Sequence, residues 1–382
     1  MINILILADH SVGGGAETQL IEEMAILQNI SNLFFISASE VSRDDLPSRV
    51  TYLGMLSQNS KEPLLAEVAI RKINIVHLHN VWHPCWYGFL RQLSLPKVMT
   101  LHDYRLVCPS GWQVRPKEVT RCKNRGIIAC TTSGCLTKNH RRETGATYFW
   151  WLYAQYLKTN VSVFLTTNMD LILELQKEGC TNVTYVNLPM INPPSFSTHK
   201  RERLVIFAGN LGVHKGVHRL ILTIKAVCEL DRSIRFIFAG DGKLREYLQT
   251  EIEGSKIDNV KVLGFIQRPA LIELLGTAAL TYLPSKWQEN FNLVSRESRL
   301  VGTPVLVPAT AGYIGRLKLG VSQYFSPQLI DHDAVQIVQI VNARNGEFGS
   351  FQDRKEEILT CSVDRFLSAI HKTYLSAGIS LY

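Results

Sequence analysis

The sequence predicts an α/β protein made of two doubly wound, parallel-sheet domains of Rossmann type that face a central cleft. The length of 382 residues suits two domains better than one. Short apolar runs alternate with amphipathic segments, which is typical of parallel strands covered by helices on both faces. This series stops at a proline-rich stretch and then starts again, so we expect two sheets and a cleft in which a ligand binds.

Each apolar run predicts one buried strand. The first series is Ile2–Leu7, Leu33–Ile36, Ile75–His79, Val98–Leu101, Val161–Leu165 and Val183–Val186. The second series is Leu204–Ala208, Ile234–Ala239, Val260–Leu263, Ala279–Leu283 and Pro304–Val307. Three prolines in the stretch 188–200 mark a linker, which gives expected domains at 1–190 and 203–352. Helical periodicity from about Asp353 to Leu375 predicts a final helix within 353–382, for which packing back on the first domain is one open arrangement.

Composition narrows the class of protein. Hydrophobic residues make up 46% and charged residues 19% of the chain, which excludes a disordered chain and a polytopic membrane protein. The stretch Met1–Asp9 fits a buried strand better than a signal peptide, and eight cysteines without such a peptide suggest thiols in a reducing compartment. We therefore expect a cytoplasmic protein.

The net charge of +8 favours an anionic partner, with nucleic acid, an acidic membrane surface and phosphorylated small molecules as candidates, although an ordinary solvated surface explains it as well. The aromatic stretch Tyr148–Lys158 favours core packing. Its alternative is contact with a membrane or lipid acceptor, that is, peripheral association with the inner face of the plasma membrane.

A glycine-rich turn follows the first expected strand. Gly14 and Gly15 precede a helical pattern, and backbone amides at such a position approach a phosphate at the positive end of the helix dipole. The turn lacks the G-x-G-x-x-G pattern of dinucleotide sites, which disfavours NAD. A simple tight turn explains the glycines equally well.

Two carboxylates flank a second predicted helix start. A helix that begins near Phe291 or Asn292 places Glu289 in the preceding loop and Glu297 in its second turn. Carboxylates accept hydrogen bonds from sugar hydroxyls, and free amides at the helix start suit a diphosphate. Taken alone, a helix-start charge and a solvated side chain are the stronger interpretation.

Several short motifs in order make the chain resemble glycosyltransferase family 4, the retaining enzymes of GT-B fold, over nearly its whole length. The motifs are Gly14–Glu17, Val76–His79, Thr100–Tyr104, Phe207–Gly209 with Lys215–Gly216, Ala239–Gly242, Gly264–Ile266 and the segment with Glu289 and Glu297. The resemblance implies a nucleotide-sugar donor bound mainly by the second domain and an acceptor bound mainly by the first.

The resemblance also implies roles for single residues. Glu297 would hold the ribose, Glu289 the donor sugar and Lys215 the diphosphate, with His102 near the reacting carbon. Asn210 stands where many relatives carry arginine. The remaining expected donor contacts are Gly14, Gly15, Gly209, Gly240, Gly264, Phe265, Ile266, Phe291, Asn292 and Leu293. Expected acceptor contacts near His102 are Asn80, Trp82, His83, Asp103, Tyr104 and Arg105.

Four cysteines, Cys108, Cys122, Cys130 and Cys135, fall in one loop-like insertion. Their spacing lacks the C-x2-C pairs of structural zinc, so packed thiols or redox-labile pairing are favoured over a metal. The D-x-D triplet at Asp331 and Asp333 fits helix capping better than a metal–nucleotide site.

The expected function is retaining transfer of a hexose, with UDP-glucose as the best donor, to a saccharide or lipid-linked acceptor in surface polysaccharide synthesis. We expect no cofactor, no catalytic metal and no nucleic-acid partner. Same-face substitution would need no covalent enzyme intermediate. The alternatives are a nucleotide-sugar epimerase or hydrolase of the same fold and a noncatalytic carbohydrate- or nucleic-acid-binding protein. All of this requires the stretch around His102 and the stretch 215–297 to act on a single sugar.

Overall fold

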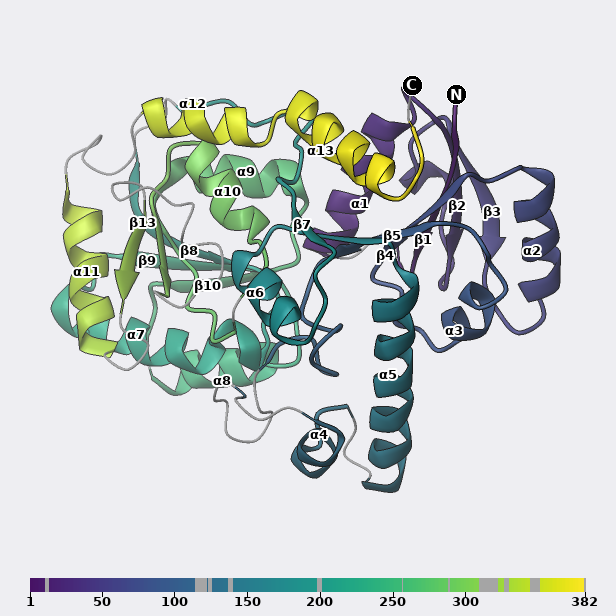
Figure 1. Cartoon of the computed structure of the whole chain (residues 1–382). Coiled ribbons are helices and arrows are strands. Elements are labelled where there is room, and N and C mark those ends of the chain that lie inside the picture. Colours follow the sequence, from purple (N-terminus) through teal and green to yellow (C-terminus); the bar gives the residue numbers. More distant parts are fainter. Residues whose placement is uncertain are drawn as a thin grey trace. The chain divides into compact units, whose positions relative to one another are not determined.

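The computed structural model of the chain divides into two compact units (Figure 1). It describes residues 1–10, 14–113, 122, 126–136, 140–197, 201–255, 257–287, 289–308, 322–325, 330–343 and 351–380. The first unit comprises 1–111, 126–191 and 360–382, and the second comprises 112–125 and 192–359. We expected 112–125 within the first domain; apart from Trp112, Gln113 and Cys122, this segment lies outside the described residues.

The first unit is built on a parallel sheet in the order β3-β2-β1-β4-β5-β6-β7. Its strands are β1 (Asn3–Ala8), β2 (Asn32–Ser37), β3 (Val50–Met55), β4 (Ile75–His79), β5 (Lys97–Leu101), β6 (Val163–Thr166) and β7 (Val183–Tyr185). Its helices are α1 (Gly15–Leu27), α2 (Lys61–Ile70), α3 (Cys85–Leu90), α4 (Ile127–Ser133), α5 (His140–Asn160), α6 (Met169–Lys177) and α13 (Val363–Ser376). The sequence predicted these strands except β3.

One face of this sheet is covered by α1 and α13. Apolar side chains of both helices share a core cluster with Ile4, Ile6 and Ile75 of the strands. Burial of such side chains is the main stabilising term for the helices, since short helices are marginal on their own. We expected one helix from Asp353 to Leu375. Instead there are two, α12 (Phe351–Thr360) and α13, because the chain leaves the helical conformation at Cys361 and Ser362 caps α13.

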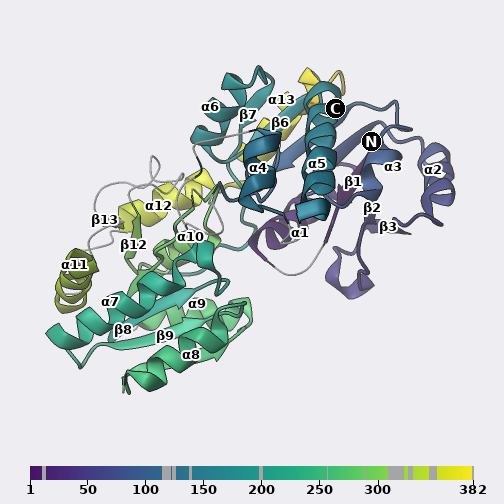
Figure 2. The ribbon, with the colours of Figure 1, turned by 90° about the horizontal axis from the view of Figure 1, so that it is seen from below.

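The second unit repeats the plan with the order β10-β9-β8-β11-β12-β13. Its strands are β8 (Glu202–Ala208), β9 (Arg235–Ala239), β10 (Val260–Gly264), β11 (Ala278–Tyr282), β12 (Val305–Pro308) and β13 (Ser322–Phe325). Besides α12, its helices are α7 (Val217–Leu230), α8 (Arg245–Gly254), α9 (Arg268–Thr277), α10 (Leu293–Leu300) and α11 (Ile330–Asn342), with a short 3-10 helix η2 (Val213–Lys215). Helices α7, α8 and α11 cover one face, with α7 and α11 side by side (Figure 2), and α9 and α10 cover the other.

These two sheets confirm the expected α/β class with parallel strands. Each sheet reverses its strand order once, between β1 and β4 in the first unit and between β8 and β11 in the second. At such a reversal the loops after the two strands diverge to opposite faces and leave a crevice at the carboxyl ends, where open α/β sheets bind ligands. Within the described residues, no helix is long and apolar enough to cross a membrane.

Candidate functional site

The strand reversal of the second unit brings two predicted site residues together. Lys215 ends η2, in the loop after β8, and Glu289 lies in the loop after β11. The Lys215 Nζ atom is 2.9 Å from Glu289 Oε1. Two charged groups expected on a diphosphate donor therefore meet at the carboxyl edge of this sheet.

A glycine allows the two loops to come this close. Gly216 has a φ of +77°, and a Cβ atom on it would lie 2.0 Å from the Pro284 carbonyl oxygen. The Lys286 amide also donates to the His214 carbonyl at 2.8 Å. Only glycine combines a positive φ with this close approach to the Pro284 carbonyl. The backbone at position 216 therefore fixes Lys215 beside the loop after β11.

Glu289 is held firmly by its neighbours. Its side chain is 2% exposed, and it accepts hydrogen bonds from the Ser285 hydroxyl and from Asn292 Nδ2, the latter at 2.8 Å. Asn292 also caps α10, where its Oδ1 accepts from the Ser295 amide at 3.0 Å. A buried carboxylate is tolerated when paired and hydrogen-bonded in this way. The expected helix start near Asn292 is confirmed, with Glu289 in the loop and Glu297 in the second turn.

Glu297 has a partner that the sequence did not indicate. Arg268, the first residue of α9, donates from Nε to Glu297 Oε1 at 2.6 Å, and the Glu297 side chain is 5% exposed. A charged pair of this kind fixes the direction of the carboxylate. Arg268 was missed because its partner lies on another helix, and nothing local in the sequence links them.

The other expected donor contacts line the same carboxyl edge. Gly240 donates to the Gly264 carbonyl at 2.7 Å, and a Cβ on Gly240 would lie 1.9 Å from the Gly209 carbonyl oxygen, so the loops after β8, β9 and β10 are closely stacked. Phe265 is 68% exposed and Ile266 packs against the core. Asn210 is exposed, and the Phe291 ring lies 4.1 Å from the Arg296 guanidinium carbon. Leu293 is the first residue of α10.

Aromatic rings surround the lysine. Trp112 stacks on His214 with ring centroids 4.2 Å apart, and Trp287 meets His214 edge-on and lies 5.4 Å from Lys215 Nζ. Burial and the charge of Lys215 lower the pKa of His214 to about 4, against the opposite effect of Glu289, so the imidazole is neutral near pH 7. None of these three aromatic residues was predicted. Trp112 and His214 are far apart in the sequence, and only the fold shows that the three side chains converge.

In the first unit, the loops after the adjacent strands β4 and β5 hold the other predicted residues. His102 directly follows β5, and its Nε2 lies 3.1 Å from His79 Nδ1 at the end of β4. Burial is the largest cause that lowers the pKa of His102, to about 4; Asp103 raises it and Arg105 lowers it. His102 is therefore neutral at physiological pH.

Some of the expected acceptor residues are accessible to a ligand, and another is buried and serves only to hold the fold. Asp103 accepts from Arg105 Nε at 2.7 Å, and the Arg105 guanidinium lies 5.8 Å from the Trp82 ring centroid. Tyr104 is fully buried, and its hydroxyl accepts from Asn168, which leaves it no exposed surface for a ligand. Asn80 has a φ of +48°.

Asp9, at the end of β1, was missed. Its carboxylate accepts from the amides of Trp82 and His83 and from Trp86 Nε1, at 2.6 to 3.1 Å. It therefore holds the loop after β4 in place.

In the glycine turn of the first unit, one backbone amide already has a hydrogen-bond acceptor within the chain. The Gly14 amide donates to the Glu17 carboxylate at 2.9 Å, and Gly15 begins α1. The preceding residues 11–13 lie outside the described part. An arriving phosphate would have to displace the Glu17 carboxylate from Gly14.

The candidate metal ligands of the sequence were four cysteines and the two aspartates of the D-x-D triplet. All eight cysteines are described as thiols. Asp333 is buried in α11 and forms an ion pair with Arg219 at 2.5 Å while accepting from the Tyr282 hydroxyl at 2.9 Å. It is thus part of a buried ion pair, and helix capping, which we expected, does not account for it. Among the described residues, metal-ligand spacing joins only Glu23, His77 and His79.

Comparison with known proteins finds that part of the chain is similar to one family of glycosyltransferases. Residues 192–339 match the model of glycosyl transferases group 1. A GDP-mannose-dependent alpha-(1-6)-phosphatidylinositol dimannoside mannosyltransferase of Mycobacterium tuberculosis is 35% identical over 150 residues, 36% of this chain and 38% of that protein. An uncharacterized glycosyltransferase of Methanocaldococcus jannaschii is 29% identical over 125 residues, 32% of each chain. The matched regions span about a third of these relatives.

Solved structures extend the similarity to both units. Anabaena HepE in complex with UDP and glucose has a TM-score of 0.72 at 17% identity, covering 98% of this chain and 100% of that one. Staphylococcus aureus TarM has a TM-score of 0.72 at 11% identity, with complete coverage of both. At these identities the likeness shows the fold, which is GT-B. Residues 192–339 are thus similar to the group 1 glycosyl transferases, and the chain has the GT-B fold over its length.

Proposed function

We propose that this chain is a retaining hexosyltransferase that moves a sugar from a nucleotide diphosphate donor to a saccharide or lipid-linked saccharide acceptor in surface polysaccharide synthesis. The observation that carries the proposal is the Lys215–Glu289 pair at the strand reversal of the second unit. A cation and a carboxylate at that edge suit the phosphates and the hydroxyls of one donor.

The chemistry follows from these groups. As the bond between the anomeric carbon and the phosphate oxygen breaks, negative charge grows on the diphosphate, and the Lys215 ammonium stabilises it. The departing phosphate takes the proton of the acceptor hydroxyl, whose oxygen bonds to the same face of the sugar. Glu289 orients the sugar hydroxyls, Glu297 the ribose and the 264–266 loop the base. We assign His102 to the donor sugar, and we propose that Lys215 does the work that a metal ion does elsewhere.

UDP-glucose is the preferred donor of this proposal, with GDP-mannose as its competitor. HepE has been solved with UDP-glucose and TarM with UDP, whereas the mycobacterial relative depends on GDP-mannose. In this proposal the 264–266 loop seats the base through backbone groups, which suit either of the two bases. Direct measurement of donor preference is therefore the first step.

A lipid-linked acceptor would bring the enzyme to the cytoplasmic face of a membrane. Exposed apolar side chains on α4 and α5 support this part of the proposal: Ile128 is 81%, Tyr148 53% and Trp151 37% exposed. Tyr148 and Trp151 stack with centroids 6.3 Å apart. Aromatic side chains of this kind favour the interfacial region of a bilayer.

The test is a donor screen by mass spectrometry, with UDP- and GDP-sugars offered with and without acceptor saccharides in EDTA. Transfer of a hexose, with the anomeric configuration shown to be retained by NMR of the product, supports the proposal. Turnover of donor without acceptor indicates an epimerase or hydrolase, and no response to any nucleotide sugar indicates a binding protein.

A further inference from the structure

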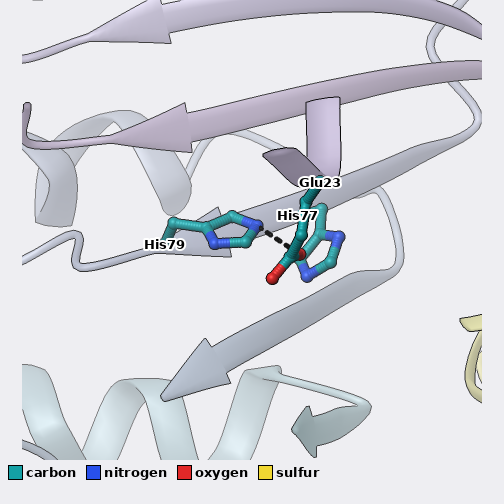
Figure 3. Close-up of side chains that lie close together, drawn as sticks. All are labelled: Glu23, His77 and His79. Atoms are coloured by element: carbon teal, nitrogen blue, oxygen red, sulfur yellow. Dashed lines mark ion pairs between the residues drawn. The ribbon is translucent and has the colours of Figure 1, made fainter. Parts of the chain in front are cut away.

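A buried carboxyl group in the first unit has no hydrogen-bond partner. Glu23 lies on the face of α1 that packs on the sheet, its side chain is 2% exposed, and neither of its oxygens is hydrogen-bonded within the described structure. Its neighbour is His79 Nε2 at 3.7 Å, also without a hydrogen bond (Figure 3). Each buried polar group without a hydrogen bond costs about 1 to 3 kcal/mol of folding free energy. Such groups are rare in native proteins and often have a functional role.

A metal site does not explain the cluster well. Ligand atoms of Glu23, His77 and His79 lie within 4.8 Å of one another. However, His77 uses Nδ1 for the Tyr374 hydroxyl at 3.0 Å and Nε2 for the Thr100 hydroxyl at 2.9 Å. A metal would have to break one of these two buried hydrogen bonds. His77 is thus a structural residue, and the unsatisfied atoms belong to Glu23 and His79.

His79 connects Glu23 with His102. Its Nε2 faces the Glu23 carboxyl, and its Nδ1 lies 3.1 Å from His102 Nε2. Burial lowers the pKa values of His79 and His102, that of His102 to about 4, so both rings are neutral at physiological pH. A neutral imidazole carries one N–H and one acceptor nitrogen, which gives such a chain a direction.

We propose that Glu23, His79 and His102 form a proton relay in which the protonation of Glu23 sets the tautomer of His102. When Glu23 is protonated, a small side-chain shift that closes the 3.7 Å gap lets its O–H donate to His79 Nε2. His79 Nδ1–H then donates to His102 Nε2, and His102 Nδ1 carries a proton. When the relay discharges, the Glu23 proton passes to His79 Nε2, the His79 Nδ1 proton passes to His102 Nε2, and one proton leaves from His102 Nδ1. Glu23 and His79 are positioning residues that act through His102.

The groups around Glu23 shift its pKa so that its proton is lost within a pH range that can be measured. Burial, and then the charge of Glu22 on the same helix, raise the pKa of Glu23 to about 8. The groups that face it are His77 and His79 of β4 and Tyr374 of α13, while His102 at the far end is also influenced by Asp103 and Arg105. His102 is half-buried, and its Nδ1 has no protein hydrogen bond in the described residues. That atom therefore offers a donor below the transition and an acceptor above it.

The consequence rests on the proposed function. If His102 contacts the donor sugar, the relay decides whether a sugar hydroxyl meets an N–H or a lone pair. The decisive test nevertheless needs no substrate. Two-bond ¹H–¹⁵N NMR of ¹⁵N-histidine protein between pH 5 and 10 reports the tautomer of each ring, with the His102 signal assigned from a His102→Asn variant.

We expect His79 and His102 in the wild type to change tautomer together, with one midpoint near pH 8. In Glu23→Gln the amide cannot ionise, so His102 should keep one tautomer throughout the pH range. Tyr374→Phe, a buried polar deletion outside the relay, should leave the His102 transition in place. A His102 tautomer that ignores both pH and Glu23→Gln overturns the relay, as does a stoichiometric metal ion that is lost in Glu23→Gln.

A kinetic arm separates this inference from the proposed function. The pH profile of kcat/KM should contain the same transition in the wild type and lose it in Glu23→Gln. A relay seen by NMR in a protein without transferase activity refutes the function and leaves the relay standing. Normal transfer without any tautomer change refutes the relay and leaves the proposed function standing.

Discussion

Lys215 and Glu289 come from the loops after two adjacent strands, β8 and β11, and their charged atoms are 2.9 Å apart. With a donor bound, the lysine would exchange this carboxylate for the diphosphate. The pair therefore keeps the buried Glu289 carboxylate and the partly buried Lys215 ammonium compensated until the substrate arrives. The first two predictions test each side of this arrangement.

Lys215→Ala should lower the rate of transfer by about 10²-fold or more, because one preorganised charge on the leaving group is lost. Lys225→Ala is the matched control, since Lys225 forms a more exposed ion pair with Glu251 in the same unit. Steady-state kinetics with saturating acceptor measures both. Equal rates for the two variants would remove Lys215 from the site.

Glu297→Gln should weaken the binding of free nucleoside diphosphate about 10-fold, because a charged hydrogen-bond acceptor for the ribose becomes neutral and the pair with Arg268 is weakened. Glu289→Gln should leave this affinity nearly unchanged and impair transfer, because Glu289 is assigned to the sugar. Calorimetry with UDP and GDP compares them. If Glu289→Gln instead lost more nucleotide affinity than Glu297→Gln, Glu289 would be assigned to the ribose and Glu297 to the sugar.

Arg219→Met should destabilise the second unit by about 3 to 5 kcal/mol, because it leaves Asp333 buried and uncompensated. The double variant Arg219→Met, Asp333→Leu should recover much of this loss. Chemical denaturation measures the free energies of unfolding. An unchanged stability in Arg219→Met would show that the ion pair contributes little.

The stability of Glu23→Gln relative to the wild type should rise with pH. The native state raises the pKa of Glu23 from 4.5 to about 8, so the stability that this group contributes is complete below pH 4.5 and is lost as the pH rises toward 8. The variant lacks this loss. The difference in unfolding free energy should therefore grow between pH 5 and 8, by up to about 1.4 kcal/mol per pH unit. The lowered histidine pKa values act in both proteins and cancel. A difference that is constant with pH contradicts a buried, protonated Glu23.

Local patterns predicted most of the fold. Continuous apolar runs such as Ile4–Leu7 identified buried central strands, and the polar residue Asn292 before a helical pattern identified the start of α10. The edge strand β3 was missed because Val50–Met55 contains Gly54 and is only partly buried. The single final helix was wrong because a cap at Ser362 divides it.

The site was predicted only as far as sequence neighbours define it. Glu289 and Glu297 stand on one helix start and were found together. Arg268 and Trp287, which complete their surroundings, depend on contacts between separate elements and leave no local pattern. Glu23 did leave one, because its carboxylate stands between Leu20 and Met24 on the buried face of α1.

The most direct test of the central claim is calorimetric titration of UDP-glucose and GDP-mannose into the wild type and Lys215→Ala, both in EDTA. The account predicts that the wild type binds one of the two donors clearly better without metal, and that Lys215→Ala loses most of this affinity. Equal affinity in the two proteins, or no binding to the wild type, would contradict it.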